Sequence, residues 1–172
     1  MIMDRKRLRV FLIALSVTLF LFGCSKGGGA LGGAGENPIN QSLVSSDPAL
    51  AMVERFNMGS NLERMAIQVA KSTHTYGMVA EKHGATNAQS VVAQEIKKLI
   101  PEYQPRWNKN LANAYSSHLS RDELHSLATD GKQSPFVSKL LTSQISAGED
   151  MKNSSIPILT DLVTKALENA IK

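Results

Sequence analysis

The chain has 172 residues with a single cysteine, and it carries 19 Lys and Arg against 15 Asp and Glu. This length suits one domain with one core, and a lone cysteine excludes an intrachain disulfide and a cysteine-based metal cluster. Residues 1–23 hold four of the basic residues and only one acidic residue, so the rest of the chain is almost neutral. The charge balance therefore does not indicate a nucleic-acid-binding surface.

Residues 1–23 are predicted to be an export signal. An unbroken apolar run at residues 10–22 follows a short cationic segment. The run is shorter than the roughly 20 residues that a membrane-spanning helix needs, and its position behind a positive segment is typical of a cleavable signal. The cationic residues are Arg5, Lys6, Arg7 and Arg9.

The end of this run, Leu21-Phe22-Gly23-Cys24, resembles the bacterial lipobox, in which a small residue precedes the cysteine that receives the lipid. The resemblance implies cleavage before Cys24 and a thioether between its sulfur and a diacylglyceryl group carrying acyl chains such as palmitate. A spare thiol or an intermolecular disulfide is the alternative interpretation. Because two or three acyl chains anchor a protein almost permanently, a membrane bound through lipid on Cys24 is the first expected partner.

Ser25 bears on the location of the anchored protein. In lipoproteins of bacteria with two membranes, which this segment resembles, Asp directly after the cysteine usually retains the protein in the inner membrane. Ser25 stands at that position and favours the outer membrane, facing the periplasm. The inner membrane and the cell surface are the alternatives, and the cell surface applies if the organism has one membrane.

Residues 24–46 are predicted to be the lipidated cysteine followed by a flexible linker. Gly, Ala, Ser, Asn and Pro predominate there. A flexible coil of about 20 residues has an end-to-end reach of roughly 25 Å. A phosphate-binding loop is not favoured, because no strand precedes the glycines and the Lys-Ser/Thr ending is missing.

Residues 47–172 are predicted to fold as an all-α bundle of about six or seven helices. Apolar residues recur at three- and four-residue steps, and strand patterns are absent. Asp47-Pro48 suits the N-cap and first position of a short helix that ends at Gly59.

Capping patterns and an apolar stripe predict the next three helices. Ser60-Asn61-Leu62-Glu63 has the form of a capping box for a helix that ends at Gly84. A third helix is expected from Thr86, and Pro101 is expected to stop it. A fourth carries the apolar stripe Tyr103, Trp107, Leu111, Tyr115 and Leu119.

Three further helices are predicted after residue 119. Ser120-Arg121-Asp122-Glu123 forms a capping box, and Gly131 is expected to close that helix in a left-handed conformation. Ser134-Pro135 predicts the start of a sixth helix that Gly148 interrupts, and the last helix is expected from about Pro157. The sixth helix is expected to bury Phe136, Val137, Leu140, Leu141 and Ile145, and the last to bury Ile158, Leu159, Leu162, Val163, Ala166, Leu167, Ala170 and Ile171.

Three segments resemble the domain of unknown function 2059 family, which comprises small helical proteins exported by bacteria. The segments are residues 110–115 (NLANAY), residues 119–124 (LSRDEL) and Ser134-Pro135 with Lys139. The resemblance extends over roughly residues 60–170 and implies a helical architecture. Because that family has no established activity, it implies no catalytic residues. The family usually has an aromatic pair before the Ser-Pro pair and a glycine soon after it, which this chain lacks.

The four histidines are the first candidates for metal or acid–base chemistry. None of them forms His-x-x-x-His or His-Glu-x-x-His, the helical spacings that hold zinc. We interpret them as solvated or partly buried side chains and predict no metal and no cofactor. The histidines are His74, His83, His118 and His125.

Glu123 and the pair Asp122–His125 are the candidates for general acid–base chemistry. Glu123 lies three residues after Ser120, which favours a capping role, and Asp122 and His125 have the spacing of a common surface pair. No serine lies in a Gly-x-Ser-x-Gly elbow. We therefore predict no catalytic residue.

Tyr103, Trp107 and Tyr115 share one helix face. An aromatic binding groove is one interpretation, and core packing is favoured because an apolar stripe must be buried in any helical domain. The scattered methionines are expected to fill gaps in the core. They are Met52, Met58, Met65, Met78 and Met151.

These observations favour a non-enzymatic envelope lipoprotein whose helical domain binds a protein or another envelope component, and no nucleic acid. A toxin-immunity protein is one alternative, and a hydrolase that acts on the cell wall or on lipid is another. A small apolar ligand held between helices is a third hypothesis.

Overall fold

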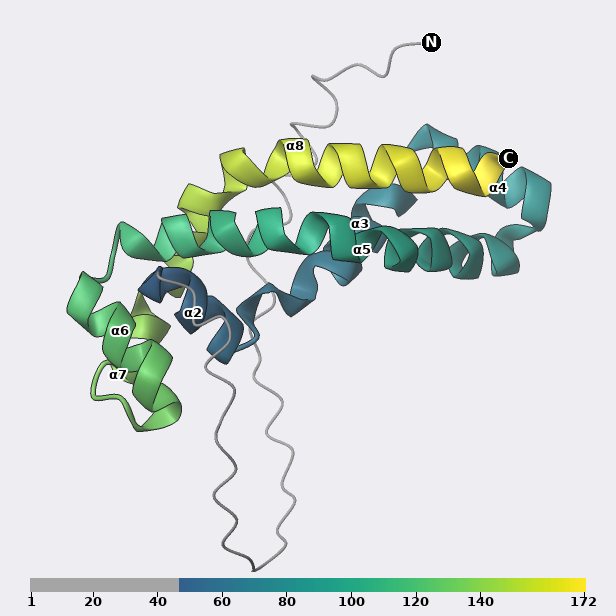
Figure 1. Ribbon diagram of the computed structural model, residues 1–172. Coiled ribbons are helices and arrows are strands. Elements are labelled where there is room, and N and C mark those ends of the chain that lie inside the picture. Colours follow the sequence, from purple (N-terminus) through teal and green to yellow (C-terminus); the bar gives the residue numbers. More distant parts are fainter. Residues whose placement is uncertain (1–46) are drawn as a thin grey trace, which may run out of the picture. The chain divides into compact units, whose positions relative to one another are not determined.

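The computed structural model describes residues 47–172, which form seven α-helices and two short 3-10 helices without a strand (Figure 1). The predicted all-α fold is confirmed for this range, whereas the export signal, Cys24 and the linker lie outside the described residues. The α-helices are α2 (Pro48–Arg55), α3 (Leu62–Lys71), α4 (His74–His83), α5 (Ala85–Ser116), α6 (Arg121–Asp130), α7 (Val137–Thr142) and α8 (Gln144–Ile171). The 3-10 helices are η1 (Met58–Asn61) and η2 (Gly131–Gln133).

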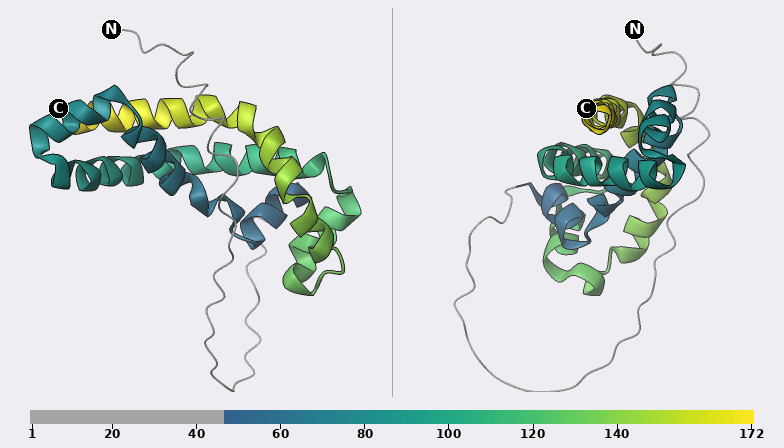
Figure 2. Two further views of the ribbon diagram at one scale, coloured as in Figure 1. Left: turned by 180° about the vertical axis from the view of Figure 1, so that it is seen from behind. Right: turned by 90° about the vertical axis from the view of Figure 1, so that its right-hand side faces the viewer.

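The two longest helices, α5 and α8, lie side by side and run in opposite directions (Figures 1 and 2). Helices α3 and α4 pack against both of them, and α2 packs against α5 and α6. The core lies between these helices. Its largest fully buried side chains include Trp107, Tyr103, Tyr115, Met52, Leu62 and Ile96.

Helix α5 is one continuous helix where two were predicted. It runs through Pro101 and Pro105 without a break. A proline inside a helix costs about 3 kcal/mol because it lacks a backbone donor. On either side of these prolines, Ile96, Tyr103 and Trp107 are at most 2% exposed. Burying each such side chain contributes about 1.5–3 kcal/mol, so packing outweighs the effect of the prolines.

The segment predicted as one helix from Ser60 to Gly84 is two helices, and its predicted capping box is wrong. Ser60 lies in η1, and α3 begins at Leu62 without a side-chain cap. Instead of capping the helix, the side-chain amide of Asn61 contacts Met65 one turn later and Trp107 of α5. It donates to the sulfur of Met65 at 3.5 Å and accepts from Nε1 of Trp107 at 3.3 Å.

Thr73 separates α3 from α4. Its hydroxyl donates to the carbonyl of Ala70 at 2.7 Å and accepts from the amide of Tyr76 at 3.1 Å. A threonine side chain can thus replace backbone hydrogen bonds at a helix junction. The predicted stop at Gly84 is confirmed by its φ of +83°, and α5 begins at Ala85, one residue before the predicted start.

Gly59 does not end the first helix as predicted. Helix α2 stops at Arg55, and Asn57 follows in a left-handed conformation with a φ of 50°. Gly59 instead allows a close approach to α5, because a Cβ atom at this position would collide with the side chain of Asn108. Its carbonyl accepts a hydrogen bond of 2.9 Å from Nε2 of Gln104.

Three of the predicted capping devices are confirmed. The carboxylate of Asp47 accepts from the amide of Ala49 at 3.0 Å, with Pro48 in the first turn. Ser120 forms the predicted capping box at the start of α6, and Gly131 closes that helix with a φ of +60°.

The segment after Gly131 departs most from the prediction. Helix α7 has Phe136 as its N-cap, so Ser134-Pro135 does not start it. Of the five apolar residues expected in the core, only Leu140 is buried. Leu141 is 48% exposed and Ile145 is 77% exposed. Phe136 and Val137 are half-buried.

Helix α8 begins at Gln144 and continues through Gly148 and Pro157, so the predicted interruption and the predicted start near Pro157 are both wrong. Its predicted apolar stripe is confirmed from Ile158 to Ala170, while Ile171 is half-buried. This stripe packs on α3, α4 and α5, which explains why the helix persists through the proline. None of the helices in residues 47–172 is both long and apolar enough to cross a membrane.

Candidate functional site

Cys24, the one site residue predicted from the sequence, lies outside the described residues. Its lipidation therefore stays a prediction. Any candidate site within residues 47–172 has to be built from the polar side chains of the helical domain.

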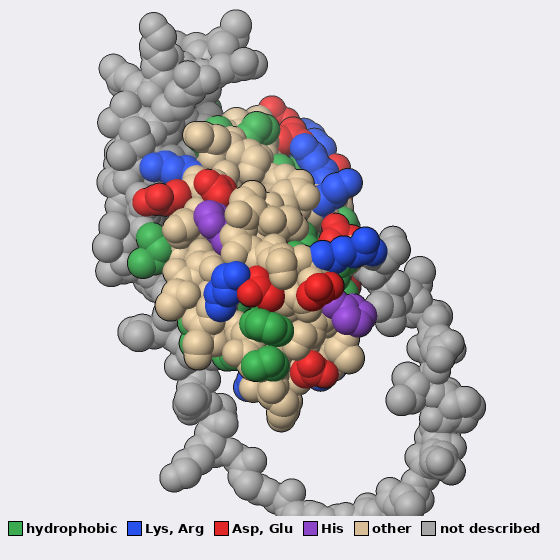
Figure 3. Space-filling view, turned by 90° about the vertical axis from the view of Figure 1, so that its left-hand side faces the viewer, with side chains coloured by type: hydrophobic (Ala, Val, Ile, Leu, Met, Phe, Trp, Pro, Cys, Tyr) green, Lys and Arg blue, Asp and Glu red, His purple; other side chains and the backbone are tan. Residues whose placement is uncertain are grey.

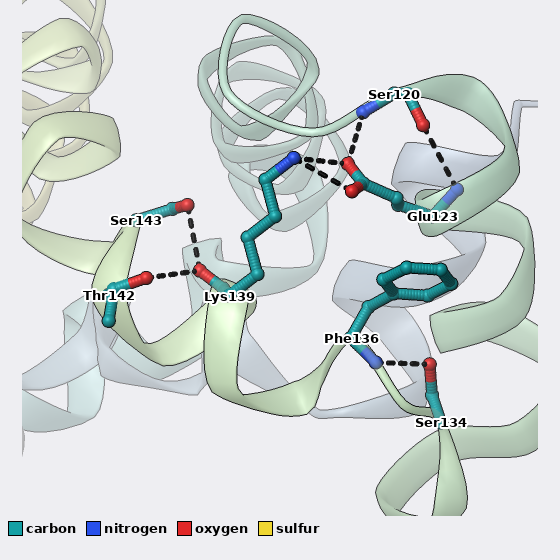
Figure 4. A network of polar contacts seen from close by, with 7 residues as sticks. All are labelled: Ser120, Glu123, Ser134, Phe136, Lys139, Thr142 and Ser143. Atoms are coloured by element: carbon teal, nitrogen blue, oxygen red, sulfur yellow. Dashed lines mark hydrogen bonds and ion pairs between the residues drawn. The ribbon is translucent and has the colours of Figure 1, made fainter.

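The first polar cluster surrounds Glu123 at the start of α6 (Figure 4). Its Oε2 atom accepts from the amide of Ser120 at 2.8 Å, and Oγ of Ser120 accepts from the amide of Glu123 at 3.3 Å. Lys139 of α7 donates to both carboxylate oxygens at 2.7 Å. These contacts, with Lys139 contributing most, hold the pKa of Glu123 below its ordinary value of 4.5. Glu123 is thus an ionised capping group, as predicted.

The hydroxyl groups near Glu123 have structural partners as well. Thr142 and Ser143 both donate to the carbonyl of Lys139, at 3.0 and 2.8 Å, at the end of α7. Oγ of Ser134 accepts from the amide of Phe136 at 3.3 Å (Figure 4). This cluster stabilises the turn between α6 and α7. Its polar side chains already have partners within the domain.

Two of the four histidines contact groups of α8. Nε2 of His118 is 2.8 Å from Oδ2 of Asp150. Nε2 of His83 is 2.8 Å from the carbonyl of Ala170. Asp150, which is 32 residues away in the sequence, is therefore the carboxylate that contacts a histidine, rather than the predicted Asp122 beside His125. Within residues 47–172, no three His, Cys, Asp or Glu side chains are grouped so that they could hold a metal ion.

The aromatic stripe of α5 is part of the core, which confirms the favoured interpretation. Tyr103, Trp107 and Tyr115 are each at most 2% exposed. The hydroxyl of Tyr103 donates to Oδ2 of Asp161 at 2.7 Å. Burial raises the pKa of Tyr115 to about 12. These rings are therefore not available for stacking on a ligand.

An ion-pair cluster lies beside Tyr103 at the α5–α8 contact. Nζ of Lys165 is 3.2 Å from Glu102, 3.8 Å from Asp161 and 5.2 Å from the centroid of the Tyr103 ring. The hydrogen bond with Tyr103, followed by that with Glu102, raises the pKa of Lys165. The charge of Lys165 is thus offset by two carboxylates of the same chain.

One helical turn after Tyr103 on α5, a shallow groove of about 330 Å³ lies between α5 and α8. Its α5 side is a polar face with residues at three- and four-residue steps, and its α8 side comes from the turn that contains Pro157. The lining residues are Arg106, Lys109, Asn110 and Asn113 from α5 and Ser154, Pro157 and Ile158 from α8.

Pro157 explains the shape of the α8 side. It cannot donate to the carbonyl of Asn153, and a proline inside a helix bends it. Figure 1 shows a bend in α8 before its straight C-terminal part. Nδ2 of Asn110 donates to the carbonyl of Ser154 at 2.8 Å, so α5 supplies a donor to this irregular turn.

The groove holds two cations that have no ion-pair partner among the described residues. Arg106 and Lys109 are exposed, and neither forms an ion pair with another described residue. A guanidinium with free donors matches a carboxylate or phosphate in two parallel hydrogen bonds. The amino-acid pattern does not reveal this groove, because the polar face of α5 looks like any solvated helix face. Ser154, whose carbonyl accepts the hydrogen bond from Asn110, is 44 residues away from it in the sequence.

No family model, no curated protein and no solved structure matches the chain. The resemblance to the domain of unknown function 2059 family therefore stays a prediction.

Proposed function

We propose that this protein is a lipid-anchored envelope protein that binds a partner without catalysing a reaction. In this proposal Cys24 carries the lipid, and the helical domain faces the periplasm from the outer membrane. The observation that carries the anchor is the position of Gly23-Cys24 at the end of a short apolar run behind four cations.

The groove between α5 and α8 is the binding surface in this proposal. Arg106 and Lys109 supply positive charge and form no ion pair with another residue of the range 47–172, and Asn110 and Asn113 supply amide groups beside it. Such a set suits a carboxylate- or phosphate-bearing component of the envelope. Support also comes from the other polar groups, since Glu123 and Lys165 already have partners within the domain.

The anchor is tested by mass spectrometry of the protein isolated from its native host. We expect an acyl adduct on Cys24 and a new N-terminus at that residue. A Cys24→Ser form should stay uncleaved and lose the outer-membrane localisation. An unmodified Cys24, or unchanged processing of the variant, would overturn the proposal.

The groove is tested by co-sedimentation of the full-length lipoprotein, in detergent, with purified cell-wall sacculi of the native host. We expect the double variant Arg106→Gln, Lys109→Gln to bind about tenfold more weakly, because charge-assisted hydrogen bonds are lost. The matched control is Arg64→Gln, Lys97→Gln, which removes two exposed cations outside the groove and should bind like the unaltered protein. Equal loss in both double variants would mean that only net charge matters, and the groove would be excluded as the site.

A further inference from the structure

Three apolar side chains form a ridge on the surface of α7 and the start of α8. Val137 and Leu141 lie four residues apart on α7, and Ile145 lies in the first turn of α8, beyond Ser143. Leu141 is 48% exposed and Ile145 is 77% exposed, while Val137 is half-buried. We call these three residues the apolar ridge. The sequence pattern here is that of a core stripe, yet no other described helix covers it.

The segment that carries the ridge is basic. Residues 131–148 contain Lys132 and Lys139, five Ser and Thr residues, and no Asp or Glu. Lys139 neutralises Glu123, the nearest capping carboxylate of α6. The first acidic side chains after the ridge are Glu149 and Asp150, and Asp150 contacts His118. The segment that carries the ridge therefore supplies hydroxyl groups and amines, which are groups that bind phosphates.

The ridge lies at the end of the domain where the described chain begins. Helix α2 starts at Pro48 and packs against α6, and α7 follows α6 (Figures 1 and 2). Figure 3 looks onto this end, where a small group of hydrophobic side chains lies at the surface. Residues 25–46 join Asp47 to Cys24, a length whose reach as a coil is roughly 25 Å. A lipid on Cys24 would thus keep this end close to the bilayer.

We propose that the apolar ridge seats on the phospholipid surface in which Cys24 is anchored, an inference that rests on the proposed lipidation. Leu141 and Ile145 enter the boundary between headgroups and acyl chains, and Lys132 contacts lipid phosphates. Apolar side chains flanked by lysines bind interfaces in this way. This contact, which we call the lipid seat, fixes which end of the domain faces the lipid.

A second copy of the chain is the other candidate occupant, and the size of the ridge argues against it. A stable protein interface needs about 800 Å² on each partner with matching shapes. Two exposed aliphatic side chains and a half-buried valine give a much smaller apolar surface. A fluid lipid surface needs no matching shape.

The test uses the lipidated full-length protein in vesicles of phosphatidylethanolamine and phosphatidylglycerol. Because lipid blocks the single cysteine, Ser138→Cys on α7 introduces the only free thiol, which is labelled with a fluorophore sensitive to polarity. We expect blue-shifted emission in vesicles. A label at Gly77→Cys on α4, where a side chain has open space, should show no shift.

The ridge itself is tested by adding Leu141→Gln and Ile145→Gln, which should abolish most of the shift at residue 138. Met78→Gln is the matched control, because Met78 is 46% exposed but lies on α4. Since all three side chains are exposed, each variant should keep the helical circular-dichroism spectrum. An equal shift with and without the ridge side chains would overturn the inference.

The mass of the same sample separates the two proposals. An acyl adduct on Cys24 together with unshifted emission would overturn the proposed contact of the ridge with lipid and would support the lipidation of Cys24. A missing adduct would overturn the anchor, and the seat with it. A shift that appears without vesicles as protein concentration rises would assign the ridge to a second copy and overturn the lipid seat.

Discussion

Lys139 of α7 holds both carboxylate oxygens of Glu123, each at 2.7 Å, while that same carboxylate caps the first turn of α6. One ion pair therefore joins two helices through a helix cap. The two residues are 16 positions apart, and the segment between them contains η2. This contact ties the short helix α7, which buries only Leu140, to the start of α6.

Glu123→Gln should remove a pH-dependent part of the stability. The pKa of Glu123 lies below 4.5 in the folded protein, so its carboxylate stabilises the fold at pH values above 4.5. This contribution is lost as the pH falls through the folded pKa. Urea unfolding at a series of pH values should therefore show the largest difference between wild type and variant near neutral pH, and a shrinking difference in acid. A constant difference would contradict the assignment of the charge to Glu123.

Tyr103→Phe should lower the free energy of unfolding by about 1 kcal/mol, because it removes the hydrogen bond to Asp161. Tyr115→Phe is the matched control, since the hydroxyl of Tyr115 forms no hydrogen bond with another described residue. This control should change the stability little at neutral pH. Thermal unfolding of both variants checks the prediction, and equal effects would count against it.

Tyr115 should also make the stability of the fold depend on pH in the alkaline range. Burial raises the pKa of Tyr115 from 10.0 to about 12, so the unfolded chain releases this proton first. The fold should lose stability between these two pH values, and Tyr115→Phe should reduce that loss. Denaturant unfolding at pH values from neutral to strongly alkaline measures the effect. Parallel curves for the two proteins would contradict it.

Gly148→Ala should stabilise the protein by about 0.5–1 kcal/mol. Gly148 lies inside α8, and an added Cβ atom would meet nothing within 4 Å. Gly131→Ala is the contrasting variant and should destabilise, because Gly131 has a φ of +60° and its Cβ atom would lie 2.9 Å from Nε of Arg55. Melting temperatures of the two variants should move in opposite directions.

Pro101→Ala should stabilise α5 by about 1–3 kcal/mol, because alanine restores the donor that proline lacks. Pro101 is exposed, so little packing is lost. Pro48→Ala serves as the control, since Pro48 occupies the first turn of α2, where the missing donor has no partner in the helix. Equilibrium unfolding should show a clear gain for Pro101→Ala and little change for Pro48→Ala. A loss of stability at residue 101 would mean that the packing of α5 depends on the proline.

The local sequence was sufficient to predict the caps at Asp47 and Ser120, the positive φ of Gly131 and the apolar stripe from Ile158 to Ala170. Each of these depends on hydrogen bonds or side-chain spacing within a few residues of one another. The interpretation of Glu123 as a capping residue also followed from its distance to Ser120. Its ion pair with Lys139 did not, because sequence spacing carries no information about contacts across a turn.

Tertiary packing decided the remaining features. Pro101 and Gly148 were expected to end helices, yet α5 and α8 continue through them. Helix α5 buries Ile96 and Tyr103 on the two sides of Pro101, and α8 buries Ala147 and Met151 on the two sides of Gly148. Leu141 and Ile145 belong to an apolar pattern like that of the core, but whether such a pattern is buried depends on which other helix lies opposite. The amino-acid sequence determined where helices form, through interactions within a turn or two, and the fold determined how long they run and which apolar residues stay exposed.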